Sequence, residues 1–125
     1  MKIKTCELNG AMLDYAVAII TNPEWTPEDI WYNTVGYEDT VDIEDVPYEP
    51  SCDWARCGPI IEQEKIVLIN PTFTNYFDTE SPWLAWMTGD IFGYGPTPLV
   101  AAMRCFVLSK LGEEVEIDIE SLLTI

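Results

Sequence analysis

Residues 95–112 read GPTPLVAAMRCFVLSKLG, and this stretch indicates both ends of a helix. Thr97 is placed as an N-cap, and Pro98 suits the first helical position. Lys110 fits the last turn, and Gly112 is the residue type favoured just past a helix end. Nearly every residue in between is apolar, so we expect protein to surround this helix on most sides.

Arg104 is the one charge in the middle of that apolar stretch. An enclosed guanidinium keeps its proton, so it needs an anionic or carbonyl partner. One interpretation is an internal ion pair with one of the chain's own carboxylates. The other is an anchor for the phosphate or carboxylate of a ligand, because the guanidinium fork suits bidentate recognition. The sequence leaves both open.

Length and charge set the broad class of the protein. At 125 residues we predict a single domain, 1–125, with 48% hydrophobic and 12% aromatic residues. The formal net charge is −16, from six basic and 22 acidic residues. Such a field repels nucleic-acid backbones and anionic lipid, so we expect no direct nucleic-acid or membrane binding. It is compatible with binding a basic host protein, or with solubility alone.

Several residue types are absent or sparse in ways that narrow the chemistry. The sequence has no histidine, which excludes Ser-His-Asp and Cys-His catalysis and any His-containing zinc site. We therefore predict no catalytic residues, no cofactor and no metal, and we favour a protein that is not an enzyme.

No apolar segment is long enough for a signal core or a membrane span, so a cytoplasmic location is expected. The four cysteines are then expected to be reduced thiols.

The remaining pattern predicts an α+β fold, with two main helices packed on a small, partly antiparallel sheet and long ordered aromatic-rich loops. A helix is expected over residues 9–20 and one or two helical turns over 27–33. Gly58-Pro59 indicates a turn that leads into a further short helix. Strands are expected at 1–6 on a sheet edge, at 65–69 in the core and, half-exposed, at 115–119, while 38–46 fits either a strand or a loop.

Two long irregular stretches, 21–50 and 71–96, hold most of the aromatic rings. Loops of this length in a small domain tend to be functional or disordered, and their apolar content argues against disorder. Large rings bind flat ligands such as bases by stacking. Surplus rings also fit a self-association surface, so a homo-oligomer is compatible with the sequence.

Two motifs resemble the NinX-like family of small bacteriophage accessory proteins. One is DWARCGPIIE at 53–62, and the other is GPTPLVAAMR at 95–104, continuing to Gly112. The opening residues 1–17 are also similar, so the resemblance covers about half the chain. It implies a phage or prophage product that acts in the cytoplasm of a bacterial host. It brings no catalytic or binding residues with it.

Arg104 and Arg56 are the strongest candidates for a ligand site, because together they would form a local positive site in a very acidic molecule. The glycine-flanked turn before the long helix offers free N–H groups near Tyr94 and Thr97. Tryptophans in the same motifs and loops could stack a base, although core packing explains each of them as well. The candidate ligand-binding residues are Arg104, Arg56, Trp54, Trp83, Trp86, Tyr94 and Thr97.

Three functions fit these features. The first is a phage accessory protein that sequesters a small nucleotide-derived ligand, such as a host immune signalling molecule. The second is an acidic decoy that inhibits a nucleic-acid-binding host protein through the carboxylates of residues 38–53. The third is a metal-dependent hydrolase that uses Asp53, Glu62 or Glu64, for which no recognisable ligand spacing is present.

Overall fold

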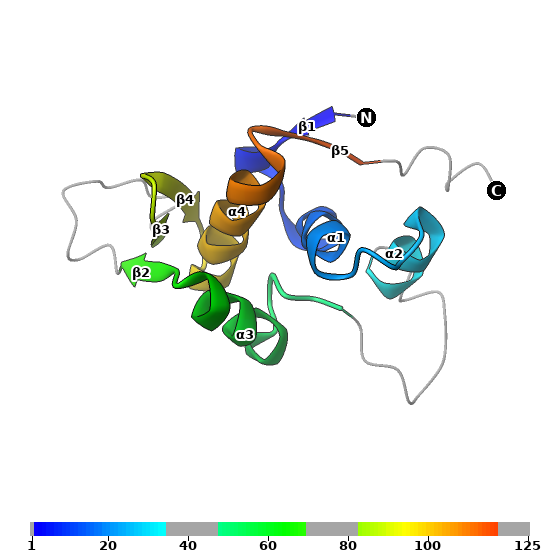
Figure 1. Ribbon diagram of the computed structural model, residues 1–125, viewed down its shortest axis with the longest axis horizontal. Helices are drawn as coiled ribbons and strands as arrows, with labels where there is room; N and C mark the ends of the chain where they lie inside the picture. The colour runs from blue at the N-terminus through cyan, green and yellow to red at the C-terminus, as the bar shows by residue number, and fades with distance from the viewer. Residues whose placement is uncertain (1, 35–47, 70–82, 118–125) are drawn as a thin grey trace.

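The computed structural model describes residues 2–34, 48–69 and 83–117. Its central element is α4 (Pro98–Leu111), which lies between α1 (Gly10–Thr21) and a hairpin of β3 (Trp83–Met87) and β4 (Ile91–Gly95) (Figure 1). Because α4 has protein on both sides, its residues 99–103 and 105–107 are all buried. The expectation of an enclosed helix is confirmed.

Both ends of α4 form as the sequence predicts. The Thr97 hydroxyl accepts a hydrogen bond from the Val100 N–H at 3.2 Å, and Pro98 is the first helical residue. Gly112 ends the helix with φ of 86°, and its N–H donates to the Leu108 carbonyl at 3.1 Å. A positive φ is costly for residues with a Cβ, so glycine is the suitable residue here.

The two N-terminal helices also follow their sequence signals. α1 contributes the core residues Leu13, Ala16 and Val17, as its apolar spacing predicts. Its N-cap, Asn9, has an extended backbone but makes no side-chain capping hydrogen bond. α2 (Pro27–Asn33) begins with a reciprocal capping box, in which Thr26 and Asp29 each accept a hydrogen bond from the other's N–H.

The expected turn at Gly58-Pro59 is wrong, because both residues lie inside α3 (Trp54–Glu64). Asp53 starts this helix five residues earlier than expected: its carboxylate accepts from the Ala55 N–H at 3.0 Å. Pro59 lies past the first turn of α3, where it removes one i→i−4 hydrogen bond and crowds the carbonyl of Ala55, but the helix continues through it. α3 ends at Lys65, which adopts a left-handed conformation with φ of 54°.

The described strands form two small antiparallel sheets. β1 (Lys2–Lys4) pairs with β5 (Glu114–Glu116), which confirms the expected N-terminal edge strand and the first part of the C-terminal strand. β2 (Val67–Ile69), β3 and β4 form the second sheet in that order. The strand expected at 65–69 forms as β2, but the expectation that it is buried is wrong: β2 is an edge strand of the described sheet, and Val67 is 43% exposed. The strand or loop considered at 38–46 lies outside the described residues.

The β3–β4 hairpin occupies part of a stretch that was expected to be irregular. Two glycines explain both the missed strand and its position. A Cβ on Gly93 would lie 2.5 Å from the Ala101 carbonyl oxygen, and a Cβ on Gly95 would lie 2.5 Å from the Ala101 nitrogen. β4 thus rests directly on the backbone of α4, and only glycine permits that approach. The α+β class is confirmed, with four helices and two antiparallel sheets in the described ranges.

Candidate functional site

A cavity of about 580 Å³ lies where β4, α4 and the N-terminal segment meet. Its volume is in the range of small-molecule sites. One wall comes from β4, a second from α4, and the rest from the turn after β1 and from the residues that lead into β5. The lining residues are Lys4, Thr5, Cys6, Phe92, Gly93, Tyr94, Arg104, Leu108, Glu113 and Glu114.

Arg104 projects from α4 into this region, and two backbone carbonyls hold its guanidinium. Nε donates to the Leu8 oxygen at 2.7 Å, and Nη1 donates to the Tyr94 oxygen at 3.0 Å. Within the described residues no carboxylate lies within ion-pair distance. Burial lowers the pKa of Arg104, while the nearby Cys6 sulfur acts in the opposite direction. A guanidinium has five N–H donors, so two carbonyls do not exhaust its capacity.

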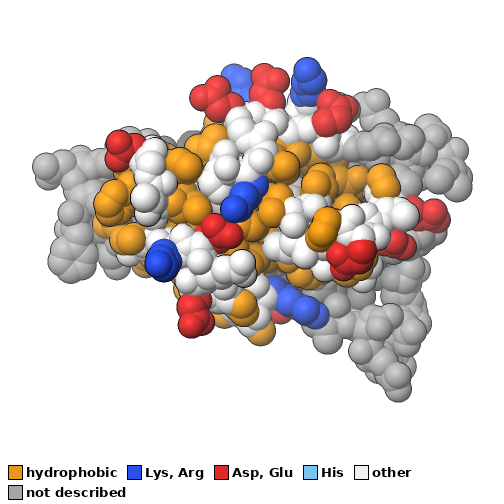
Figure 2. Space-filling model, in the orientation of Figure 1, with side chains coloured by type: hydrophobic (Ala, Val, Ile, Leu, Met, Phe, Trp, Pro, Cys, Tyr) orange, Lys and Arg blue, Asp and Glu red, His pale blue; other side chains and the backbone are white. Residues whose placement is uncertain are grey.

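The cavity carries charges of both signs. Lys4 and Arg104 supply positive charge, and Glu113 and Glu114 supply negative charge. Lys4 and Glu114 are register partners in the β1–β5 sheet. Acidic and basic side chains gather at the end of the molecule that carries these two strands (Figure 2). The site therefore suits a ligand that carries an anionic group together with hydrogen-bond donors.

Aromatic residues stand on the face of the second sheet that points away from α4. Trp86 and Phe92 are cross-strand partners, 39% and 42% exposed. Their rings stack with centroids 6.4 Å apart and planes 16° apart. Phe92 and Tyr94 also line the cavity, so this aromatic face continues into it. Figure 2 shows hydrophobic side chains reaching the surface over this hairpin.

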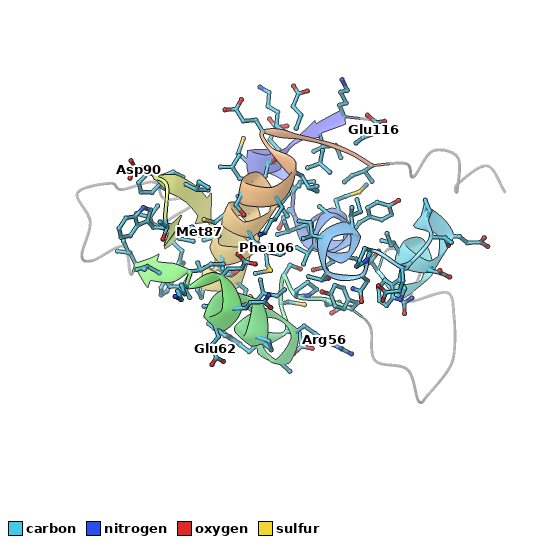
Figure 3. The ribbon with its side chains drawn as sticks, viewed as in Figure 1. Arg56, Glu62, Met87, Asp90, Phe106 and Glu116 are labelled. Carbon is cyan, nitrogen blue, oxygen red and sulfur yellow. The ribbon has the colours of Figure 1, made fainter. Side chains whose placement is uncertain are left out.

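The other candidate residues lie elsewhere. Arg56 is exposed on α3, with its guanidinium 5.7 Å from the centroid of the Tyr48 ring, and it projects away from the β3–β4 hairpin (Figure 3). Trp54 is 55% exposed at the start of α3, and Trp83 packs against the core. Thr97 serves as the cap of α4. The described structure brings Tyr94 to Arg104, and it does not bring Arg56 there.

Local sequence patterns provide little indication of the other cavity residues. Lys4, Cys6 and Glu113 are brought to α4 by the β1–β5 pairing, which joins the two ends of the described chain. A charged residue in a short terminal segment has no local pattern that indicates a site. Phe92 was one of many aromatic residues in its stretch. The only sequence feature that set it apart was its position next to Gly93, and the structure shows that Gly93 and Gly95 contact α4.

The acidic stretch of the decoy hypothesis lies mostly outside the described residues, since only 48–53 are described. There the Glu49 carboxylate accepts from the Cys52 thiol at 3.2 Å, and Asp53 caps α3. For the hydrolase hypothesis, Glu64 forms an ion pair with Lys110 at 3.6 Å. The described ranges contain no group of three or more His, Cys, Asp or Glu residues placed to hold a metal ion.

A second buried polar cluster lies away from the cavity. Asp14 of α1 is 2% exposed, and its carboxylate accepts from the Ser51 N–H at 2.7 Å and from the Ser51 hydroxyl at 3.0 Å. Burial raises the pKa of Asp14 to about 6, although both hydrogen bonds act against the rise. This group ties the chain before α3 to α1.

Comparison with known proteins places the chain in a class of viral proteins. Residues 4–110 match the family described as bacteriophage P22, NinX. The chain belongs to this bacteriophage family, which agrees with the motifs at 53–62 and 95–104. No curated protein matches the chain. Among the described residues, no helix is long and apolar enough to cross a bilayer.

Proposed function

We propose that this phage protein sequesters a small nucleotide-derived ligand in the cavity beside Arg104. A host immune signal, such as a cyclic nucleotide or a cyclic ADP-ribose derivative, is the kind of ligand that would give a phage accessory protein a use for such a site. Arg104 binds the phosphate, with Lys4 contributing further positive charge. Tyr94 and Phe92 contact the base or ribose.

The main support for this proposal is that the hydrogen-bond partners of Arg104 are backbone carbonyls. Its guanidinium is held by neutral carbonyls in a cavity, rather than neutralised by a carboxylate among the described residues. The charge therefore remains available to an anion, and partial burial strengthens the attraction because the local dielectric constant is lower than in water. The two carbonyls also fix the guanidinium, which reduces the entropy lost on binding.

The mixture of acidic and basic residues in the cavity lining further restricts the class of ligand that can bind there. Glu113 and Glu114 repel a bare anion such as inorganic phosphate. A nucleotide carries N–H and O–H donors beside its phosphate, so it can satisfy carboxylates and guanidinium together. The net charge of −16 acts against any anion at long range and is screened by salt. We therefore expect affinity for nucleotides to increase with ionic strength.

Isothermal titration calorimetry with AMP, GMP, cyclic dinucleotides and cyclic ADP-ribose tests the proposal. Arg104→Lys keeps the charge but removes the planar fork, and Lys4→Ala removes the second cation. Each substitution should lower the affinity for the nucleotide by about tenfold or more, as expected for loss of a charge-assisted hydrogen bond. Arg56→Ala is the matched control, because it removes an exposed arginine that does not line the cavity.

Two results would reject the proposal. One is the absence of binding across this panel. The other is binding that Arg104→Lys and Lys4→Ala leave unchanged. Salt-sensitive capture of a basic protein from bacterial lysate, without nucleotide binding, would instead favour the acidic decoy, because exposed charge pairs are screened by ions.

A further inference from the structure

The stacked rings of Trp86 and Phe92 define a direction across the sheet. Trp86 lies on the central strand β3, and Phe92 lies opposite it on β4, which is an edge strand of the described sheet. One face of the Phe92 ring is turned toward Trp86, with planes only 16° apart. Its opposite face is therefore turned toward the free edge of β4, which is the edge that pairs with no strand among the described residues.

The free edge of β4 is also the side on which the cavity lies. Phe92 lines the cavity, whereas Trp86 does not. Arg104 reaches the same edge, because its Nη1 donates to the carbonyl of Tyr94, two residues further along β4. A flat group in the cavity can therefore lie against the exposed ring of Phe92. The guanidinium of Arg104 is bound two residues further along β4, a strand length of about 7 Å.

We propose that a purine base stacks on the free face of Phe92 and extends the Trp86–Phe92 stack, while its phosphate lies at Arg104. This inference rests on the proposed function, and it names the ligand class as purine nucleotides. Phe92 contacts the ligand directly. Trp86 is a positioning residue that supports the Phe92 ring from behind and fixes its plane.

The size of the aromatic patch favours a base over a protein partner. Aromatic side chains bury 150–250 Å² each when fully enclosed. At 39% and 42% exposure, Trp86 and Phe92 together leave roughly 120–200 Å² open, and Val67, the partner of Trp86 on β2, adds a side chain that is 43% exposed. A stable protein interface needs about 800 Å² on each partner. One base covers the available area, and a purine covers more of it than a pyrimidine.

Calorimetry with AMP, CMP and ribose 5-phosphate tests the inference on the full chain. All three carry the same phosphate, so Arg104 contributes equally to each. Base stacking on an aromatic ring should make AMP bind about tenfold to a hundredfold more tightly than ribose 5-phosphate, with CMP between them. Phe92→Leu should reduce this preference to less than about threefold, and Phe92→Tyr should retain it.

Trp86 has a different signature. Trp86→Leu should reduce the preference for AMP over ribose 5-phosphate by about threefold to tenfold, without changing the affinity for ribose 5-phosphate, while Trp86→Phe restores it. Trp54→Leu is the matched control, because Trp54 is exposed on α3 and does not line the cavity. Both Phe92 and Trp86 are partly exposed, so these variants are expected to fold.

The location of the ligand has its own readout. Cys6 is exposed and lines the cavity, so bound AMP should slow its modification by a thiol reagent in a Cys52→Ser background. Equal binding of AMP and ribose 5-phosphate, with loss of both in Arg104→Lys, would overturn this inference and leave the proposed function standing. A preference for AMP that Phe92→Leu does not change, or AMP binding without protection of Cys6, would also overturn it. Absence of AMP binding overturns it as well.

Discussion

At the scale of single residues, the structural role of Arg104 and its proposed role in ligand binding depend on the same geometry. Its bonds to the Leu8 and Tyr94 carbonyls connect α4 to the start of α1 and to the edge of β4. These contacts stabilise the fold, and in the proposed function they also hold the guanidinium in place for a ligand. The sequence predicted an anionic or carbonyl partner for Arg104, and carbonyls are what the described structure contains. It could not specify which carbonyls, because Leu8 lies 96 positions away.

Replacing Arg104 should therefore reduce stability as well as binding. Arg104→Ala leaves two partly buried carbonyls without their donor, and hydrogen bonds to charged groups contribute about 1.5–3 kcal/mol each. We expect chemical denaturation to show a free energy of unfolding lower by about 2–4 kcal/mol. Arg56→Ala, which loses an exposed cation–π contact, should cost about 1 kcal/mol or less. Equal losses in the two variants would contradict this assignment.

Asp14 should make stability depend on pH in an unusual direction. Its pKa is about 6 in the folded state, against 3.8 for the ordinary group. The folded protein therefore binds this proton more tightly, so the contribution of Asp14 to the free energy of unfolding falls as pH rises from about 4 to 6. The two pKa values correspond to a loss of about 3 kcal/mol. Glu49 and Cys57 also interact electrostatically with Asp14.

Asp14→Asn removes this titration and keeps partners for Ser51, since its amide can accept from the Ser51 N–H and donate to the Ser51 hydroxyl. Urea denaturation at a series of pH values should show the variant gaining on the wild type by up to about 3 kcal/mol between pH 4 and pH 7. Parallel curves for Asp14→Asn would show that Asp14 does not titrate in this range.

At the scale of elements, local signals predicted the helices better than the strands. The helix caps at Thr97, Thr26 and Gly112 involve only residues a few positions apart, so they can be predicted from the local sequence. The β3–β4 hairpin depends on contacts with α4, a helix that comes later in the chain. Its glycines also weaken the sequence pattern that would indicate a strand. Gly58-Pro59 misled for a different reason: the local cap at Asp53 starts α3 upstream of this turn signal, and the helix continues through both residues.

The close contact of β4 with α4 can be tested by adding one methyl group. In Gly93→Ala the new Cβ would meet the Cys105 nitrogen at 2.6 Å as well as the Ala101 oxygen, so the strand must move. We expect a loss of about 1–3 kcal/mol or more in thermal or chemical unfolding. Gly58→Ala is the control, because its Cβ meets nothing within 4 Å inside α3. It should change stability by less than about 0.5 kcal/mol, because the higher helix propensity of alanine is offset by crowding of its Cβ against the following Pro59 ring. Similar effects at both positions would contradict the packing described here.

At the scale of the whole molecule, the pattern of expected helices and strands predicted the fold class, and the pairing of β1 with β5 shapes the candidate site. The cavity exists because β1 pairs with β5 and brings the N-terminal segment over α4. Neither strand is longer than three residues, so no periodic pattern could indicate that pairing. Arg104 and Tyr94, which both line the cavity, were named from sequence because the glycine-flanked turn that holds Tyr94 leads directly into the helix that holds Arg104. Lys4 and Phe92 were missed because they reach the site through tertiary contacts.

The net charge of −16 leads to the last prediction, which concerns the molecule as a whole. Self-repulsion among 22 acidic residues destabilises the folded state more than the expanded unfolded chain. Salt shortens the screening length from about 30 Å at 0.01 M to about 10 Å at 0.1 M, so most of the relief should occur at low salt. Differential scanning calorimetry at pH 7 should show a midpoint that rises steeply with NaCl up to about 0.1 M and then levels off. At pH 4, where about half of ordinary carboxyl groups are protonated, the same titration should give a clearly smaller rise. A midpoint that responds equally to salt at both pH values would show that repulsion between carboxylates is not what limits stability.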